Sequence, residues 1–157
     1  MPILTTLREF LDAAGVPYEV RSHRPAFTAQ ETAAAEHIPG QEMAKVVMLW
    51  DGAEYLMAVL PAPHHVALQR FAEVAGRREV RLATEPEFAG LFPGCEVGAM
   101  PPFGNLYNIP VWVDEALTGD DEITFNAGNH EQTVHMKYPD FARLVRPQVA
   151  AFSGQSL

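Results

Sequence analysis

The sequence has few of the groups on which common enzyme mechanisms depend. It contains one cysteine, Cys95, and three serines in 157 residues. A single cysteine excludes intrachain disulfides and zinc sites that need several thiolates. No serine lies in a G-x-S-x-G turn and no G-x-x-x-x-G-K-[ST] loop is present, so neither an α/β-hydrolase nucleophile nor a P-loop nucleotide site has support.

Long hydrophobic runs and positive charge are also scarce. The longest apolar stretches, 46–50 and 56–60, are far shorter than the roughly 20 residues that span a bilayer. No basic-then-apolar segment opens the chain, so we expect a cytoplasmic protein with no membrane partner. The net charge of −9 argues against coating nucleic acid by bulk charge. This net charge is still compatible with a protein that binds a single phosphate or the end of a nucleic acid.

The apolar periodicity predicts one α+β (mixed α/β) domain over 1–157, with its core at 4–147 and a frayed tail at 150–157. Because hairpins and short connections dominate, we expect a mixed, largely antiparallel sheet of about six or seven strands flanked by helices. Capping boxes at Thr28–Glu31 and Thr84–Glu87 would each start a helix. Further helices are expected at 4–14, 66–75 and 138–145, and strands at 18–21, 44–50, 54–60, 80–82, 111–113, 123–126 and 132–137.

The histidines and the cysteine do not indicate a metal or a cofactor. His64 and His65 are adjacent and would point to opposite sides of an extended chain. His130 and His135 are five residues apart and would not share a helical face. Cys95 stands beside Glu96, which disfavours a thiolate, so a buried structural role is expected rather than a nucleophile. We therefore expect no metal and no cofactor.

Two features indicate a pocket. Residues 92–110 are rich in proline and glycine with interleaved apolar residues, which is typical of a packed, functional loop. The chain has only two lysines, and Lys45 opens its most apolar strand. Lys45 is either a strand-edge lysine whose amine reaches solvent or a compact cation directed into a pocket.

Several segments, in order along the chain, resemble motifs of one family. They are the His-x-x-x-x-Thr-x-x-Glu stretch at 23–31, Ala44-Lys45-Val46-Val47, Leu60-Pro61-Ala62, the G-x-x-x-P segment at 98–102 and Phe125-Asn126-Ala127-Gly128-Asn129-His130. Over about residues 4–147 the sequence resembles the YbaK/EbsC family of aminoacyl-tRNA deacylases, free-standing relatives of the prolyl-tRNA synthetase editing domain. The resemblance implies hydrolysis of the ester between a small mischarged amino acid (Ala, Ser, Thr or Cys) and a tRNA.

The resemblance also implies roles for individual residues. Lys45, Gly98 and Pro102 would form the catalytic group, with Lys45 as a cation at the terminal phosphate or the ester, and loop N–H groups stabilising the oxyanion. Thr28 is expected to cap a helix beside the pocket, and His130 either shapes the amino-acid pocket or faces water. The substrate-binding residues would be His23, Thr28, Met100, Pro101, Phe103, Gly128, Asn129 and His130.

The implied partner is the 3′ end of an aminoacyl-tRNA, with a synthetase as a candidate second partner and a monomer as the default state. One position departs from the family: some relatives carry a polar residue directly after the lysine, where this chain has Val46. The edited amino acid therefore does not follow from the resemblance. Two alternatives stay open, a non-catalytic tRNA-end or nucleotide-binding module and a hydrolase that depends on Cys95.

Overall fold

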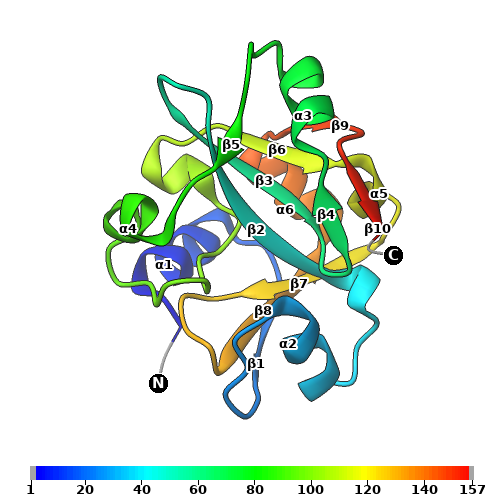
Figure 1. The fold of residues 1–157 in the computed structure, drawn as a ribbon. Coiled ribbons are helices and arrows are strands. Elements are labelled where there is room, and N and C mark those ends of the chain that lie inside the picture. The colour runs from blue at the N-terminus through cyan, green and yellow to red at the C-terminus, as the bar shows by residue number, and fades with distance from the viewer. Residues whose placement is uncertain (1–2, 156–157) are drawn as a thin grey trace.

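A computed structural model describes residues 3–155, which form an eight-stranded sheet with helices on both faces and a separate two-stranded sheet (Figure 1). The strands are β1 (Tyr18–Ser22), β2 (Met43–Trp50), β3 (Tyr55–Pro61), β4 (His64–Val66), β5 (Arg81–Leu82), β6 (Val111–Asp114), β7 (Glu122–Asn126), β8 (Gln132–Lys137), β9 (Gln148–Ala150) and β10 (Ser153–Gln155). The helices are α1 (Thr5–Ala14), α2 (Ala29–Ala35), α3 (Leu68–Ala75), α4 (Glu85–Phe88), α5 (Glu115–Thr118) and α6 (Tyr138–Val145). Short 3₁₀ turns lie at η1 (Gly40–Glu42), η2 (Ala89–Leu91) and η3 (Gly104–Tyr107).

The large sheet mixes the two kinds of pairing. Its order is β1-β8-β7-β2-β3-β6-β9, and β5 adds to β2. Neighbours are antiparallel in β1–β8, β8–β7, β2–β3 and β2–β5, and parallel in β7–β2, β3–β6 and β6–β9. The expected mixed α/β class is therefore confirmed.

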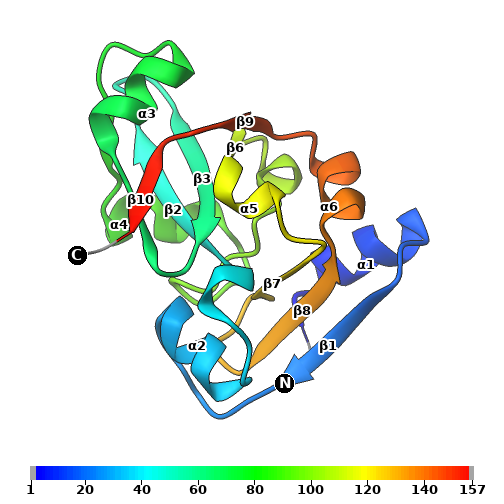
Figure 2. The ribbon, with the colours of Figure 1, turned by 90° about the vertical axis from the view of Figure 1, so that its right-hand side faces the viewer.

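The two faces of the sheet are covered differently (Figure 2). One face packs on α1, α6 and the 92–110 loop, with Leu7, Phe103 and Phe141 fully buried in the main core. The other face is shared by α3, which packs Phe71 against β2 and β3, and by α2 at the opposite end. Near α2 this second face carries the polar side chains of Lys45, Asn126 and Thr133.

Local signals in the sequence begin and end the elements as expected. Thr28 caps α2, because its hydroxyl accepts the Glu31 N–H at 3.0 Å. Thr84 and Glu87 form the reciprocal capping box of α4. Gly15 ends α1 in the left-handed conformation, at φ 70°. Within residues 3–155 no helix is long and apolar enough to cross a membrane.

The expectation of a frayed tail at 150–157 was wrong for 150–155. Phe152 is fully buried and its ring lies 5.0 Å from that of Phe71. The Asp114 carboxylate accepts the N–H groups of Phe152 and Ser153 at 2.8 and 3.0 Å, and β10 then pairs with β4. The core consequently extends beyond residue 147. Residues 156 and 157 lie outside the described part of the chain.

The same pairing shifts another expected boundary. Helix α3 begins at Leu68 and not at residue 66, because Val66 pairs with Ser153 in the two-stranded sheet. Strands β4, β9 and β10 have three residues each, which is too short to show an alternating pattern. They raise the number of strands above the expected six or seven.

Candidate functional site

Strand β2 has an opening along one edge. On this side β7 pairs with Met43 and Ala44, and β5 pairs with Leu49 and Trp50, so among the described strands none pairs with residues 45–48 there. The Met48 carbonyl faces this side, since it accepts the N–H of a residue next to β5, Ala83, at 2.9 Å. Peptide groups two residues apart face the same side of a strand, so the backbone of residue 46 also faces the opening. The backbone polar groups of residue 46 on this side are therefore not paired by any described strand.

Lys45 lies where the opening begins. Its side chain is half-buried, and burial lowers the pKa of its amine from the usual 10.5. Among the described residues it has neither a hydrogen-bond partner nor an ionic partner. A cation partly removed from water without a counter-charge is well placed to bind an anionic or strongly polarised group.

A polar row crosses the sheet from Lys45. Strands β2 and β7 pair Ala44 with Phe125, and continuing this parallel register by one residue brings Lys45 level with Asn126. Asn126 in turn pairs with Thr133 of β8. Ala44 and Phe125 point into the main core, so Lys45, Asn126 and Thr133 occupy the opposite face, which α2 partly covers.

Helix α2 is attached to this row by a buried polar cluster. The Thr133 hydroxyl donates to the Glu36 carboxylate, with oxygens at 2.7 and 2.8 Å. His23 Nε2 lies 3.6 Å from the same carboxylate, and His23 Nδ1 donates to the Arg24 carbonyl at 2.6 Å. The side chains of His23 and Glu36 are only 1% and 3% exposed. The His23 ring therefore faces Glu36 with no hydrogen bond from Nε2 among the described residues, and the Thr133 hydroxyl attaches the end of α2 to the sheet.

We expect Thr133→Val to lower the free energy of unfolding by about 1–3 kcal/mol, because it leaves the buried Glu36 carboxylate without its hydroxyl donor. Valine has nearly the same shape, so packing is preserved. Urea denaturation followed by circular dichroism measures the change. Thr118→Val is the control, since its partly exposed hydroxyl binds only a nearby helix carbonyl. Equal stabilities of the two variants would contradict a role for the cluster.

The turn after β7 joins three of the predicted segments. Gly128 donates to the Ala99 carbonyl at 2.9 Å, which attaches the G-x-x-x-P loop. The Ala26 N–H donates to the His130 carbonyl at 3.1 Å, which attaches the early His-containing segment. Gly98 has φ 87°, and an added Cβ there would lie 3.6 Å from the His130 ring. The structure thus brings 23–27, 96–99 and 128–130 together.

His130 is a buried residue of this turn. Its side chain lies under the exposed ring of Phe27, with ring centroids 4.9 Å apart. Nε2 donates to the Val97 carbonyl at 2.9 Å, while Nδ1 is buried and has no hydrogen-bond partner in the described part of the chain. The alternative of a histidine facing water is wrong. Asn129 supports the turn, because it accepts the Glu131 N–H at 2.8 Å.

The second half of the loop is anchored in the core. Met100, Pro101, Pro102 and Phe103 are all buried, and the Phe103 ring lies 5.4 Å from the ring of Phe141. The side chain of Phe103 has no exposed surface, so it supports the loop from below. Within residues 3–155 the N–H groups of Gly98 and Met100 have no hydrogen-bond acceptor. The loop can therefore offer backbone donors, and not long side chains, to a ligand.

Cys95 is poorly suited to act as a nucleophile. Burial raises the pKa of its thiol, and its sulfur lies 3.8 Å from the Tyr107 hydroxyl.

In the described residues no three His, Cys, Asp or Glu side chains are grouped to hold a metal ion. His64 is buried against the Ser153 hydroxyl at 2.9 Å while His65 is exposed, as their adjacency predicted.

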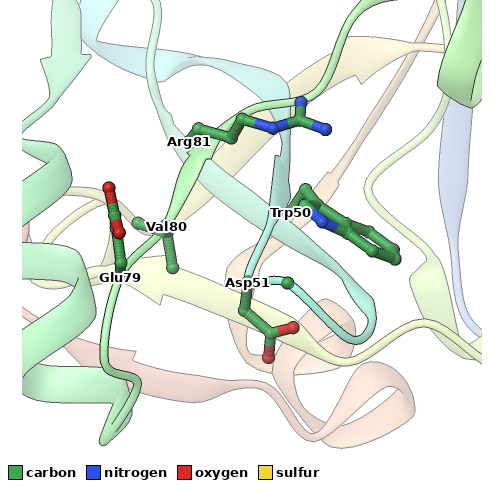
Figure 3. A pocket seen from close by; sticks show the side chains of 6 residues that line it. Trp50, Asp51, Glu79, Val80 and Arg81 are labelled. Carbon is green, nitrogen blue, oxygen red and sulfur yellow. The ribbon is translucent and has the colours of Figure 1, made fainter.

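A cavity of about 280 Å³ lies at the other end of β2 from Lys45 (Figure 3). Its basic group, Arg81, makes two hydrogen bonds of 2.8 Å to the Glu87 carboxylate. One of its two acidic groups, Asp51, binds Arg77 at 2.9 Å. Since Arg81 is already paired, the cavity lacks an unpartnered cation of the kind found at Lys45. It is lined by Trp50, Asp51, Gly52, Glu79, Val80 and Arg81.

A family model described as the aminoacyl-tRNA editing domain matches residues 23–144. The chain belongs to this family. The match begins at His23 and includes Lys45, the G-x-x-x-P loop and the Gly128 turn. The resemblance seen in the sequence is therefore confirmed for the editing-domain family, and the narrower YbaK/EbsC assignment stays a prediction.

Similar proteins agree with this assignment. Over 100 residues the editing domain is 32% identical to the multifunctional Ser/Thr-tRNA deacylase ProXp-y of Escherichia coli (strain K12). That match covers 63% of this chain and 59% of the relative. A candidate trans-editing enzyme for prolyl-tRNA synthetase has the same fold, with a TM-score of 0.82, 22% identity and 95% of each chain covered. The crystal structure of a hypothetical protein has a TM-score of 0.85 and 24% sequence identity, and the match covers 95% of this chain and 99% of that protein.

The polar row of the editing domain contains residues that sequence reasoning did not select. Asn126 and Thr133 share one face with Lys45, Glu36 contacts Thr133 from the end of α2, and only Asn126 lies inside a quoted motif. The alternation in β7 could have found Asn126, because Ile123 and Phe125 point into the core and leave it on the other face. Glu36 is close to Thr133 only through folding, 97 residues apart in sequence.

Proposed function

We propose that this editing domain is a trans-acting deacylase that hydrolyses the ester between a small mischarged amino acid and the 3′ end of a tRNA. Serine and threonine are the first candidates, because the curated relative is named for them, with alanine and cysteine in the same size class. The observation that carries the proposal is Lys45, a half-buried cation without a partner among the described residues, at the opening of β2. It is the kind of group that a phosphate or a polarised ester would complete.

The proposed chemistry needs no protein nucleophile. An aminoacyl ester is already activated, so the site has to hold it, place a water molecule and stabilise the negative charge that develops on the ester oxygen. The N–H groups of Gly98 and Met100, which have no acceptor in the described part of the chain, are the proposed oxyanion donors. Lys45 acts as a fixed positive charge and remains a poor base while it is protonated.

The proposed specificity works by exclusion. A methylene group is worth only about 1–3 kcal/mol of discrimination in a synthetic site, so a second site that admits only small residues adds selectivity. In this chain Val46 follows the lysine, and its apolar side chain cannot form a hydrogen bond with a polar amino acid of the substrate. The shape of the pocket would then decide which residue is removed.

A panel of mischarged tRNAs tests the proposal. The protein is incubated with Ser-, Thr-, Ala- and Cys-charged tRNAs and with correctly charged controls, and the loss of labelled amino acid is followed. Faster loss from at least one small-residue tRNA supports a deacylase. No loss from any of them at high protein concentration rejects it, and tRNA binding without turnover would select a non-catalytic module.

Replacing Cys95 by alanine is expected to leave deacylation within about twofold of the parent. Its thiol pKa is raised by burial, so little thiolate forms near neutral pH. The measurement is kcat/KM on whichever tRNA the panel identifies, with thermal melting as a check on folding. A loss of a hundredfold or more in a folded variant would restore the cysteine-dependent alternative.

A further inference from the structure

Asn126 has a polar atom that the fold leaves unsatisfied. The residue is 9% exposed, and its Oδ1 is buried with no hydrogen-bond partner in the described part of the chain. Its neighbour Thr133 does not supply one, because that hydroxyl is committed to Glu36. Buried amide oxygens are almost always hydrogen-bonded, since leaving one unpaired opposes folding. An acceptor kept in this state beside Lys45 indicates that a ligand completes it.

The ligand must supply a donor to Asn126 and an acceptor or a negative charge to Lys45. The two residues are level with each other across β2 and β7, yet no hydrogen bond joins them. The end of an aminoacyl-tRNA offers both kinds of group: ester and phosphate oxygens, and a ribose hydroxyl adjacent to the ester. Its α-amino group is a second possible donor, but when protonated it would place a cation next to the Lys45 ammonium. The hydroxyl is therefore the better match.

We propose that Asn126 binds the free ribose hydroxyl beside the ester and so orients the terminal adenosine against Lys45. The inference rests on the proposed function, because it names a contact of the same site. It assigns Asn126 to substrate binding and leaves the α2 cluster of His23, Glu36 and Thr133 as its structural support.

Binding of non-hydrolysable analogues tests this contact without requiring turnover. The first probe is 3′-amino-3′-deoxyadenosine carrying serine through an amide. The second probe lacks the 2′-hydroxyl, and the third carries 3-hydroxypropionate in place of serine and so lacks the α-amino group. Each dissociation constant is measured by calorimetry on the parent, on Asn126→Leu and on the control Asn105→Ala. Asn105 is an exposed asparagine of η3.

The parent is expected to bind the first probe about threefold to tenfold tighter than the second, the usual effect of one neutral hydrogen bond. Asn126→Leu should abolish this difference, and Asn105→Ala should keep it. The melting temperature of Asn126→Leu should not fall, because leucine removes an unsatisfied acceptor at similar volume. A merely structural asparagine would give the reverse, a lower melting temperature with an unchanged preference.

Three results would overturn the inference. In the first, Asn126→Leu still binds the first probe more tightly than the probe without the 2′-hydroxyl. In the second, Asn126→Leu instead loses a preference for the first probe over the probe without the α-amino group. In the third, the parent does not bind the first probe. Failure of the proposed function is read separately. A negative mischarged-tRNA panel combined with analogue binding that depends on Asn126 would reject the deacylase and keep the contact.

Discussion

Replacing Lys45 by alanine is expected to lower kcat/KM for deacylation by at least tenfold, equivalent to about 1.4 kcal/mol of transition-state stabilisation. The reason is the environment of the amine: it is half-buried, and within the described residues nothing neutralises it. In the free protein this ammonium group loses part of its solvation energy. A negative group of the substrate compensates this loss when it binds.

The chain provides a matched control. Lys137, its only other lysine, is exposed where β8 meets α6, so Lys137→Ala removes the same charge away from the opening. It should leave kcat/KM within about twofold. Thermal melting should show Lys45→Ala folded, because removing a half-buried unpaired cation does not weaken the core. Equal rates for the parent and Lys45→Ala would remove Lys45 from the site.

The dependence on salt shows which group Lys45 contacts. If it binds the terminal phosphate, Lys45→Ala should reduce the slope of log binding constant against log salt concentration by about 0.7, the value for one contact to a single strand. If it polarises the ester, the slope should stay the same while kcat falls. Binding of uncharged tRNA between 50 and 200 mM salt separates the two cases.

The second large effect concerns folding. Phe152→Ala is expected to lower the free energy of unfolding by about 3–5 kcal/mol, because it empties a fully buried ring site. Phe152 packs against Phe71 of α3, and its N–H is held by Asp114 at 2.8 Å, so the loss would also loosen β10. Urea denaturation gives the value.

Phe27→Ala is the matched control for this change. The Phe27 ring is 68% exposed, and surface substitutions usually change stability by no more than about 0.5 kcal/mol. If Phe152→Ala costs less than about 1 kcal/mol, residues 150–155 are the loosely held tail that the sequence predicted.

The elements predicted correctly are those defined by nearby residues. Thr28 caps α2 through a residue three positions away, and Gly15 ends α1 by its own backbone conformation. These interactions are complete within a few residues, so composition and spacing reveal them. Strands β9 and β10 depend on Asp114 and Phe71, which come from distant parts of the chain, and their short sequences carry no alternation. Nothing local could predict them.

The candidate site divides in the same way. Lys45 and the G-x-x-x-P loop could be predicted, because a lysine in an apolar strand and a proline-rich segment can be recognised from the sequence alone. Asn126 was not selected, because its importance depends on an unsatisfied atom and on the register between β2 and β7. Phe103 was assigned to substrate binding from its motif, but its position under the loop depends on packing against α6.

The pairing of β4 with β10 has a consequence for synthesis on the ribosome. Residues 64–66 cannot form their two-stranded sheet until residues 153–155 have been synthesised. The apolar cluster on the β2–β3 hairpin likewise stays incomplete until Phe152 has been added. At typical rates of about 5–20 residues per second, the 86 residues between Val66 and Ser153 take about 4–17 s to translate. During that interval the cluster of Leu49, Leu56 and Leu60 is covered by α3 and lacks the Phe152 ring. A nascent chain of this kind is a natural client for chaperones, and its yield should depend on them more strongly than the stability of the finished domain suggests.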